Sequence, residues 1–256
     1  MRKPFIAGNW KMNKTPSEAR ELVSELKERV SDVDDVDMAV CPTAVALPAV
    51  VEELKDSDIM VGAQNMYWED SGSYTGEISP AMLNDLDLDY VIIGHSERRE
   101  YFNETDEEVN LKVKKALDSG LKPIVCVGES LEERKAGRTR EKVSFQVKAA
   151  LAGVPGERIP EVTIAYEPLW AIGTGESASA EEAASTIDSI REIIAELSPG
   201  AEDEIRIQYG GSVKPHNIED FITKPTLDGA LVGGASLTAE SFAGVIKKCQ
   251  NRGPNQ

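Results

Sequence analysis

The chain is poor in cysteine, and its three cysteines are not arranged for a metal site or a disulfide framework. Cys41, Cys126 and Cys249 are an odd number, and they lack the paired short spacing of structural zinc ligands. We therefore expect reduced thiols and no bound metal.

Positive charge is also scarce, with 28 Lys and Arg against 45 Asp and Glu and a net charge of −17. Nucleic acids and anionic membranes attract basic surfaces, so neither is an expected partner. The chain has no apolar run long enough to cross a membrane, and its first residues do not form a cleavable signal. The simplest expectation is a soluble cytoplasmic protein.

The sequence also lacks a Pro/Gly/Ser-rich linker, a low-complexity tract or an abrupt shift in charge, so residues 1–256 are predicted to form a single domain. Short apolar segments alternate with helix-like segments at intervals of roughly 30 residues. The predicted strands cover residues 5–10, 36–41, 59–63, 90–94, 123–127, 162–166, 205–209 and 229–232. Eight β-then-α units predict an α/β fold with parallel strands, closed into a (β/α)8 barrel.

Several helix starts are marked by capping boxes, in which a Ser or Thr and a Glu three residues later satisfy the first backbone N–H groups. These patterns begin at Thr15, Thr105 and Ser179. The first also has proline at the first helical position, which favours a helix start.

The segment 164–178 places a glutamate at the end of a strand. Glu167 precedes Pro168, and a residue before proline is held extended, so Glu167 is predicted to stay at the strand end. The following residues are apolar and then include Gly173 and Gly175, which permit close backbone approach to a ligand. This composition predicts a lid, and the alternative is a buried strand followed by a tucked-in turn.

Other polar residues follow the predicted strands, where active sites of such barrels lie. Asn9 lies at the carboxyl end of the first strand and Lys11 follows it, and His95 and Glu97 follow the fourth. A lysine at a strand end must be paired or solvated, and Glu97 is a plausible partner that would keep Lys11 fixed and charged. The alternative for Lys11 is an exposed loop lysine.

Histidine is rare, and only His95 has a suggestive position, since we interpret His216 as a surface residue. His95 precedes a helix-like run, and the dipole at a helix N-terminus disfavours a protonated imidazole. A neutral histidine there could donate a hydrogen bond at pH 7. The alternative is a structural histidine bonded to the backbone.

Glycine pairs follow the seventh and eighth strands, at Gly210-Gly211-Ser212 and Gly233-Gly234. Either pair could be an ordinary tight turn, but together they occupy the usual phosphate-binding loops of a barrel, with Gly173 as a further backbone donor. The sequence lacks a Gly-x-Gly-x-x-Gly after the first strand and a P-loop, so a nucleotide is not predicted. One carboxylate base, one histidine, one cation and a phosphate cradle suit proton transfer beside a carbonyl of a small phosphorylated substrate.

Five segments together resemble the triosephosphate isomerase family from end to end. These are residues 8–13, 94–99, 165–175, 209–213 and 232–236. The resemblance implies a (β/α)8 TIM barrel that interconverts dihydroxyacetone phosphate and glyceraldehyde 3-phosphate, in glycolysis and gluconeogenesis, without a cofactor.

The resemblance also implies roles for individual residues. Glu167 would move the proton between carbons one and two, His95 would polarise the carbonyl, and Lys11 and Asn9 would bind substrate and steady the enediolate. The phosphate would be bound by backbone N–H groups, those of Gly173, Ser212, Gly233 and Gly234.

The family is usually dimeric, through a loop after the third strand that enters the neighbouring subunit. Here Thr75 is the residue expected near the partner's site. The chain departs from the family pattern at Ser73, Glu176 and Ala180, which leaves lid motion open. Two alternatives to this reading are another phosphate-binding barrel enzyme, such as a sugar-phosphate isomerase or a Schiff-base lyase, and a non-catalytic scaffold.

Overall fold

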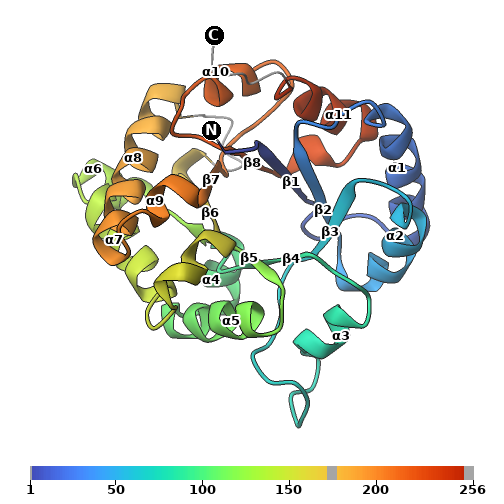
Figure 1. The fold of residues 1–256 in the computed structure, drawn as a ribbon, viewed down its shortest axis with the longest axis horizontal. Coiled ribbons are helices and arrows are strands. Elements are labelled where there is room, and N and C mark those ends of the chain that lie inside the picture. The colour runs from blue at the N-terminus through green and yellow to red at the C-terminus, as the bar shows by residue number, and fades with distance from the viewer. Residues whose placement is uncertain (1, 172–177, 251–256) are drawn as a thin grey trace.

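The computed structural model describes residues 2–171 and 178–250, and its strands form a closed parallel barrel (Figure 1). The strands are β1 (Phe5–Asn9), β2 (Asp37–Cys41), β3 (Ile59–Ala63), β4 (Tyr90–Ile93), β5 (Lys122–Val127), β6 (Thr163–Tyr166), β7 (Arg206–Tyr209) and β8 (Gly229–Val232). Each pairs with the next in sequence, and β1 closes the ring against β8. The predicted (β/α)8 barrel is confirmed.

The strand ends differ from the predicted ones by at most one residue. β4 stops at Ile93 because Gly94 has a φ of +71°, a left-handed conformation that cannot continue a strand. β1 stops at Asn9, although the N–H of Trp10 still donates to the Cys41 carbonyl at 3.1 Å. The strands are buried on both faces, which is why they appear in the sequence as apolar runs.

Helices surround the barrel on its outside (Figure 1). They are α1 (Pro16–Arg29), α2 (Leu47–Leu54), α3 (Pro80–Asn84), α4 (Ser96–Phe102), α5 (Asp106–Asp118), α6 (Leu131–Lys135), α7 (Thr139–Ala150), α8 (Ala180–Leu197), α9 (Ala201–Glu204), α10 (Ile218–Ile222) and α11 (Ala239–Lys247), with 3₁₀ turns at Ala44–Ala46, Gly156–Glu161, Leu169–Ala171 and Gly234–Ser236. The capping boxes predicted at Thr15, Thr105 and Ser179 are formed at the starts of α1, α5 and α8. Within the described ranges, no helix combines the length and the apolar character that a membrane span needs.

The core has two layers, because successive side chains of a strand point to opposite faces. Phe5 and Ala7 of β1 belong to the cluster inside the barrel, whereas Ile6 belongs to the larger cluster between strands and helices. Phe5 stacks on Tyr90 with ring centroids 4.7 Å apart, near the amino ends of the strands. The interior is thus packed, and the polar site is built at the carboxyl ends.

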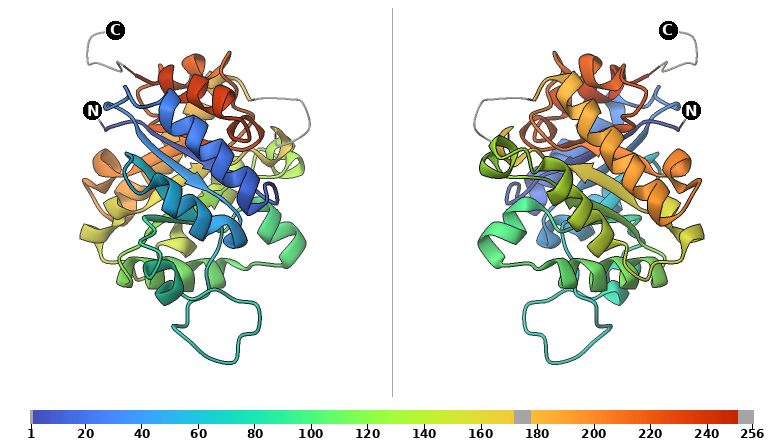
Figure 2. Two further views of the ribbon diagram at one scale, coloured as in Figure 1. Left: turned by 90° about the vertical axis from the view of Figure 1, so that its right-hand side faces the viewer. Right: turned by 90° about the vertical axis from the view of Figure 1, so that its left-hand side faces the viewer.

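One connection departs from the compact outline of the barrel. The residues between β3 and α3, numbers 64–79, extend away from the ring of helices at the bottom of each view (Figure 2). Their tip around Thr75 is exposed.

Candidate active site

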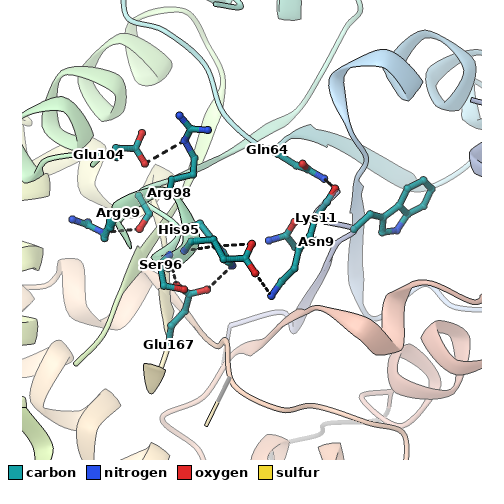
Figure 3. Close-up of polar contacts among 12 residues, drawn as sticks. Asn9, Lys11, Gln64, His95, Ser96, Arg98, Arg99, Glu104 and Glu167 are labelled. Atoms are coloured by element: carbon teal, nitrogen blue, oxygen red, sulfur yellow. Dashed lines mark hydrogen bonds and ion pairs between the residues drawn. The ribbon is translucent and has the colours of Figure 1, made fainter. Parts of the chain in front are cut away.

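A cavity of about 480 Å³ opens at the carboxyl ends of the strands and gathers most of the predicted site. Its lining includes Asn9, Lys11, His95, Glu167, Ser212, Gly233 and Gly234. Glu97 lies in an adjoining cavity of about 310 Å³, which shares Lys11 and His95 with the first. Figure 3 shows Glu167, His95 and Lys11 pointing toward one common centre. Gly173 and Glu176 lie outside the described residues, as does most of the predicted lid.

Glu167 follows β6 directly, as the sequence predicts, and its carboxylate is held by two hydrogen bonds. Its Oε1 lies 2.9 Å from Nε2 of His95, and its Oε2 accepts the backbone N–H of Ser96 at 3.0 Å. The side chain is buried, at the centre of the site (Figure 3). A Cβ on Gly210 would lie 2.8 Å from Cγ of Glu167, so a glycine is needed there for the carboxylate to reach this position.

Two opposing effects act on the charge of Glu167. Burial raises the pKa of its carboxyl group, but His95 and the Ser96 N–H prevail, and the pKa is lowered from its ordinary value of 4.5. The carboxylate is therefore ionised and able to accept a proton at neutral pH. The sequence did not reveal the Ser96 contribution, since a backbone N–H can bond a residue 71 positions away only in the folded chain.

His95 is the N-cap residue of α4, directly before the first helical residue, Ser96. Its Nδ1 accepts the N–H of Glu97 at 3.2 Å, which satisfies one of the first backbone donors of the helix. Because an accepting Nδ1 carries no proton, the neutral ring has its proton on Nε2, directed at Glu167. The predicted location of His95 at a helix N-terminus is thus confirmed. In its neutral form, the imidazole can donate a hydrogen bond through Nε2.

The direction of the pKa shift of His95 differs from the prediction made from helix position. Burial lowers the pKa of His95, but the adjacent Glu167 carboxylate outweighs burial, and the pKa is raised above 6.5. The prediction that the helix dipole depresses protonation did not include Glu167, which lies 72 residues away in sequence and 2.9 Å away in space. A ligand that displaces Glu167 from His95 removes the main cause of the increase in the pKa of His95.

The lowered pKa of Glu167 predicts a pH dependence of the substrate-free site. Because the folded pKa of Glu167 is lowered, its contribution to stability is present above pH 4.5 and is lost as pH falls through the folded pKa. In a ¹³C NMR titration, the chemical shift of the Glu167 carboxyl carbon should therefore change with a midpoint below pH 4.5. A midpoint above 4.5 would mean that burial outweighs the two hydrogen bonds and that the site is not held as described.

Lys11 lies just beyond β1 in a left-handed conformation, with a φ of +51°. Its N–H donates to Oδ1 of Asn9 at 3.0 Å, and its carbonyl accepts Nε2 of Gln64 at 2.9 Å (Figure 3). Its ammonium group lies 2.7 Å from Oε1 of Glu97, so the predicted pair is confirmed and the exposed-loop alternative is wrong. Asn9 and Gln64 thus fix the backbone that carries the cation.

The glycine pair after β8 lies close to Lys11, and the pair after β7 lines the same cavity. A Cβ on Gly233 would be 3.6 Å from Cε of Lys11, which places this backbone beside the cation. Ser212 is held through its carbonyl, which accepts Nδ2 of Asn217 at 3.0 Å. Both segments line the cavity with backbone and small side chains, an arrangement that leaves room for an anion near a positive charge.

The segment after Glu167 is anchored by a residue that sequence reasoning missed. Glu129 is fully buried, and its Oε1 accepts hydrogen bonds from the hydroxyl of Tyr166 at 3.2 Å and the indole N–H of Trp170 at 3.1 Å. The N–H of Leu169 donates to the Glu129 carbonyl at 3.1 Å. Glu129 is the second residue after β5, at the same carboxyl end of the barrel as Glu167, and this position was the available signal.

Of the predicted site residues that the structure describes, Thr75 lines neither this cavity nor the adjoining one. It is exposed at the tip of the 64–79 loop. The sequence predicts no metal site. In the ranges 2–171 and 178–250, no group of three or more His, Cys, Asp or Glu side chains is placed to hold a metal ion.

Known proteins with similar sequences share one description. A family model for triosephosphate isomerase matches residues 4–249. The chain is 57% identical over 249 residues to the triosephosphate isomerase of Carboxydothermus hydrogenoformans, covering 96% of this chain and 99% of that relative. It is 58% identical over 247 residues to the triosephosphate isomerase of Clostridium botulinum strain Langeland, with 96% and 99% covered.

A solved structure agrees with these sequence relationships. The crystal structure of triosephosphate isomerase from Bartonella henselae matches this chain with a TM-score of 0.87 and 36% sequence identity, over 96% of this chain and 98% of that one. Its fold matches the barrel that carries Glu167, His95 and Lys11. This chain therefore belongs to the triosephosphate isomerase family of enzymes.

Proposed function

We propose that the chain interconverts dihydroxyacetone phosphate and D-glyceraldehyde 3-phosphate through an enediolate, as a step of glycolysis and gluconeogenesis that needs no cofactor. The observation that carries this proposal is the pairing of the Glu167 carboxylate with Nε2 of His95 at 2.9 Å, in a cavity that also holds Lys11 and the glycine segments. A base and a hydrogen-bond donor side by side suit proton removal next to a carbonyl.

In this proposal, the substrate separates the two partners of that pair. Glu167 exchanges its contacts with His95 and Ser96 for the substrate carbon, from which its ionised carboxylate takes the proton. The Nε2–H of His95 then points at a substrate oxygen, where it stabilises the negative charge that develops and passes protons between the two oxygens. Lys11 supplies a fixed positive charge, and Asn9 keeps its backbone in place.

The phosphate has a natural place in the same cavity. The backbone N–H groups of Ser212, Gly233 and Gly234 would bind it near Lys11, with Gly173 as a further donor from the lid. Closure of residues 168–178 would exclude water, which matters because an exposed enediolate can eliminate its phosphate. Glu129 and Trp170 would set the fixed end of that lid.

The test is an assay with each triose phosphate as sole substrate, in the presence of a chelator and without added cofactor. Interconversion in both directions supports the proposal. Borohydride treatment during turnover distinguishes the lyase alternative, since a Schiff-base lysine would be trapped and the enzyme inactivated. Absence of interconversion would contradict the proposal and favour the scaffold alternative.

We also propose a homodimer in which the 64–79 loop completes the partner's site. The lining of the adjoining cavity beside Lys11 and Glu97 includes Met12 and Phe102, residues that are 93% and 66% exposed. Large exposed apolar side chains around a cavity are typical of a surface that another chain covers. In a twofold dimer, each loop can enter the cavity of the other subunit, with Thr75 near its polar end.

Substitution of the loop tip tests this arrangement. We expect Thr75→Arg to give a monomer at nanomolar concentration and to lower kcat by about 10- to 100-fold, because a small misplacement of a catalytic group costs up to about 100-fold. Sedimentation and kinetics of the same samples measure both effects. Ser185→Arg, at an exposed position of α8, is the matched control and should remain dimeric and active. A fully active monomer would contradict the shared site.

The chemical setting fits a cytoplasmic enzyme, as the sequence predicts. The three cysteines are buried thiols, and burial raises the pKa of Cys41 to about 12, so this thiol stays protonated and unreactive.

A further inference from the structure

The cavity must accept a doubly charged phosphate in a protein whose own charge is −17. Apart from histidines, the basic side chains that line it in the described structure are Lys11 and Lys214. Lys11 is already paired with Glu97 at 2.7 Å, and Glu167 adds another carboxylate to the lining. Without Lys214, these fixed charges would present a net negative charge to an incoming dianion.

Lys214 is held close to the segment that carries Ser212. Its N–H donates to Oδ1 of Asn217 at 2.8 Å, and Nδ2 of the same Asn217 donates to the Ser212 carbonyl at 3.0 Å. The N–H of Ile218, the first residue of α10, donates to the Lys214 carbonyl at 3.2 Å. These bonds fix the backbone of Lys214 at the rim of the cavity. The side chain therefore keeps the ammonium group near that rim.

The side chain of Lys214 is exposed, and no ion pair joins its ammonium group to a carboxylate elsewhere in residues 2–171 or 178–250. Neighbouring lysines differ in this respect. Lys247 is paired with Asp32 at 2.9 Å, and Lys248 is paired with Glu219 at 2.8 Å. The charge of Lys214 is therefore available to a ligand, whereas the charges of these neighbours are offset by carboxylates.

We propose that Lys214 is a steering residue, whose positive charge draws the phosphate dianion to the cavity and speeds its entry. A local cation at the mouth of a cavity concentrates field lines and raises the association rate of an oppositely charged ligand. This role rests on the proposed function, since it takes a phosphorylated substrate as the ligand. It acts during approach, so it changes kcat/KM and leaves the chemistry at Glu167 and His95 untouched.

The test compares Lys214→Met with the unaltered enzyme at two ionic strengths. At about 0.01 M salt the Debye length is about 30 Å, and at about 0.15 M it is about 8 Å, so steering should be strong in the first condition and weak in the second. We expect kcat/KM of Lys214→Met to fall about three- to tenfold at low salt and to approach the unaltered value as salt rises. The value of kcat should change by less than about twofold.

Two further variants separate steering from other roles. Lys214→Arg keeps the charge and should retain both the rate and its salt dependence. Lys55→Met removes one positive charge from an exposed position at the end of α2, in a surface hollow lined by residues at the amino ends of β2 and β3. It should leave kcat/KM unchanged, because the effect requires a charge beside the cavity and not a change in net charge.

Three results would overturn the proposal. These are an unchanged kcat/KM in Lys214→Met at low salt, an equal loss in Lys55→Met, and a loss that persists at high salt and is not rescued by arginine. Failure of the proposed function would look different, because the unaltered enzyme would then not convert triose phosphates at all. In that case, stabilisation against thermal unfolding by inorganic phosphate still reports whether Lys214 attracts a dianion, and equal stabilisation of the Lys214→Met variant would again overturn its role.

Discussion

Replacing Glu167 with glutamine is expected to lower kcat by about 10²- to 10⁴-fold, the usual contribution of a general base. An amide cannot accept the proton from carbon, and the other carboxylate near the centre, Glu97, is committed to Lys11 at 2.7 Å. Substrate binding should change far less, because Lys11 and the backbone donors of the phosphate segments are untouched. Steady-state kinetics in both directions measure the two effects.

The fold of this variant should survive. In the unaltered protein the Ser96 N–H donates to Oε2 of Glu167 at 3.0 Å, and the amide oxygen of glutamine can accept the same hydrogen bond. Glutamine also has nearly the volume of glutamate. A thermal unfolding curve close to that of the unaltered enzyme would confirm that the loss of rate is chemical. Glu167→Asp is the geometric control, since it keeps a carboxylate but withdraws it by one methylene group, and it should lose less activity than Glu167→Gln.

An independent signal of the same substitution comes from His95. Glu167 raises the pKa of His95 against the effect of burial, so removal of the carboxylate should lower that pKa. The chain has only two histidines, and the exposed His216 provides the reference signal in an NMR titration. Near-unaltered turnover, or a His95 pKa that does not fall, would contradict the assignment of Glu167 as the base coupled to His95.

The fold could be predicted from sequence because its determinants are local. Strands buried on both faces appear as short apolar runs, and capping patterns such as Thr15 to Glu18 mark where helices begin. Glu167 could be placed because Pro168 fixes the backbone before it. Positions at strand ends then identify site residues once the barrel is assumed, since all parallel strands end on the same side.

The electrostatics of the site could not be predicted in this way, because they depend on contacts between distant segments. His95 was expected to be disfavoured as a cation, but the Glu167 carboxylate reverses the direction of its pKa shift. Similarly, nothing local indicates that Lys112 is buried against Glu104 and donates to Asn65 at 2.9 Å, beneath the loop that carries Thr75. Sequence position identifies the charged groups, and only the folded geometry decides which of them share a proton or a partner.

The second large effect is expected for Lys11→Met, which should lower kcat/KM by about 10²- to 10³-fold. This is the usual range for the loss of one preorganised group that stabilises the charge of the transition state. The substitution removes the cation and also leaves Glu97 without its partner at 2.7 Å. A carboxylate beside an incoming dianion and a developing enediolate opposes both binding and chemistry, so KM should rise and kcat should fall together.

These two causes can be separated by a double substitution. Lys11→Met combined with Glu97→Gln removes both charges of the pair, so no carboxylate of the pair is left facing the substrate. We expect the double variant to recover about tenfold in kcat/KM relative to Lys11→Met, which is the size of a typical coupling energy between two close charges. Glu97→Gln alone should leave the cation in place and cost less than Lys11→Met. If the double variant were no better than Lys11→Met, then Glu97 would not face the substrate. If Lys11→Met kept its activity and its salt dependence, Lys11 would have to be regarded as an ordinary loop residue, and the positive charge that the enediolate needs would have to come from elsewhere in the cavity.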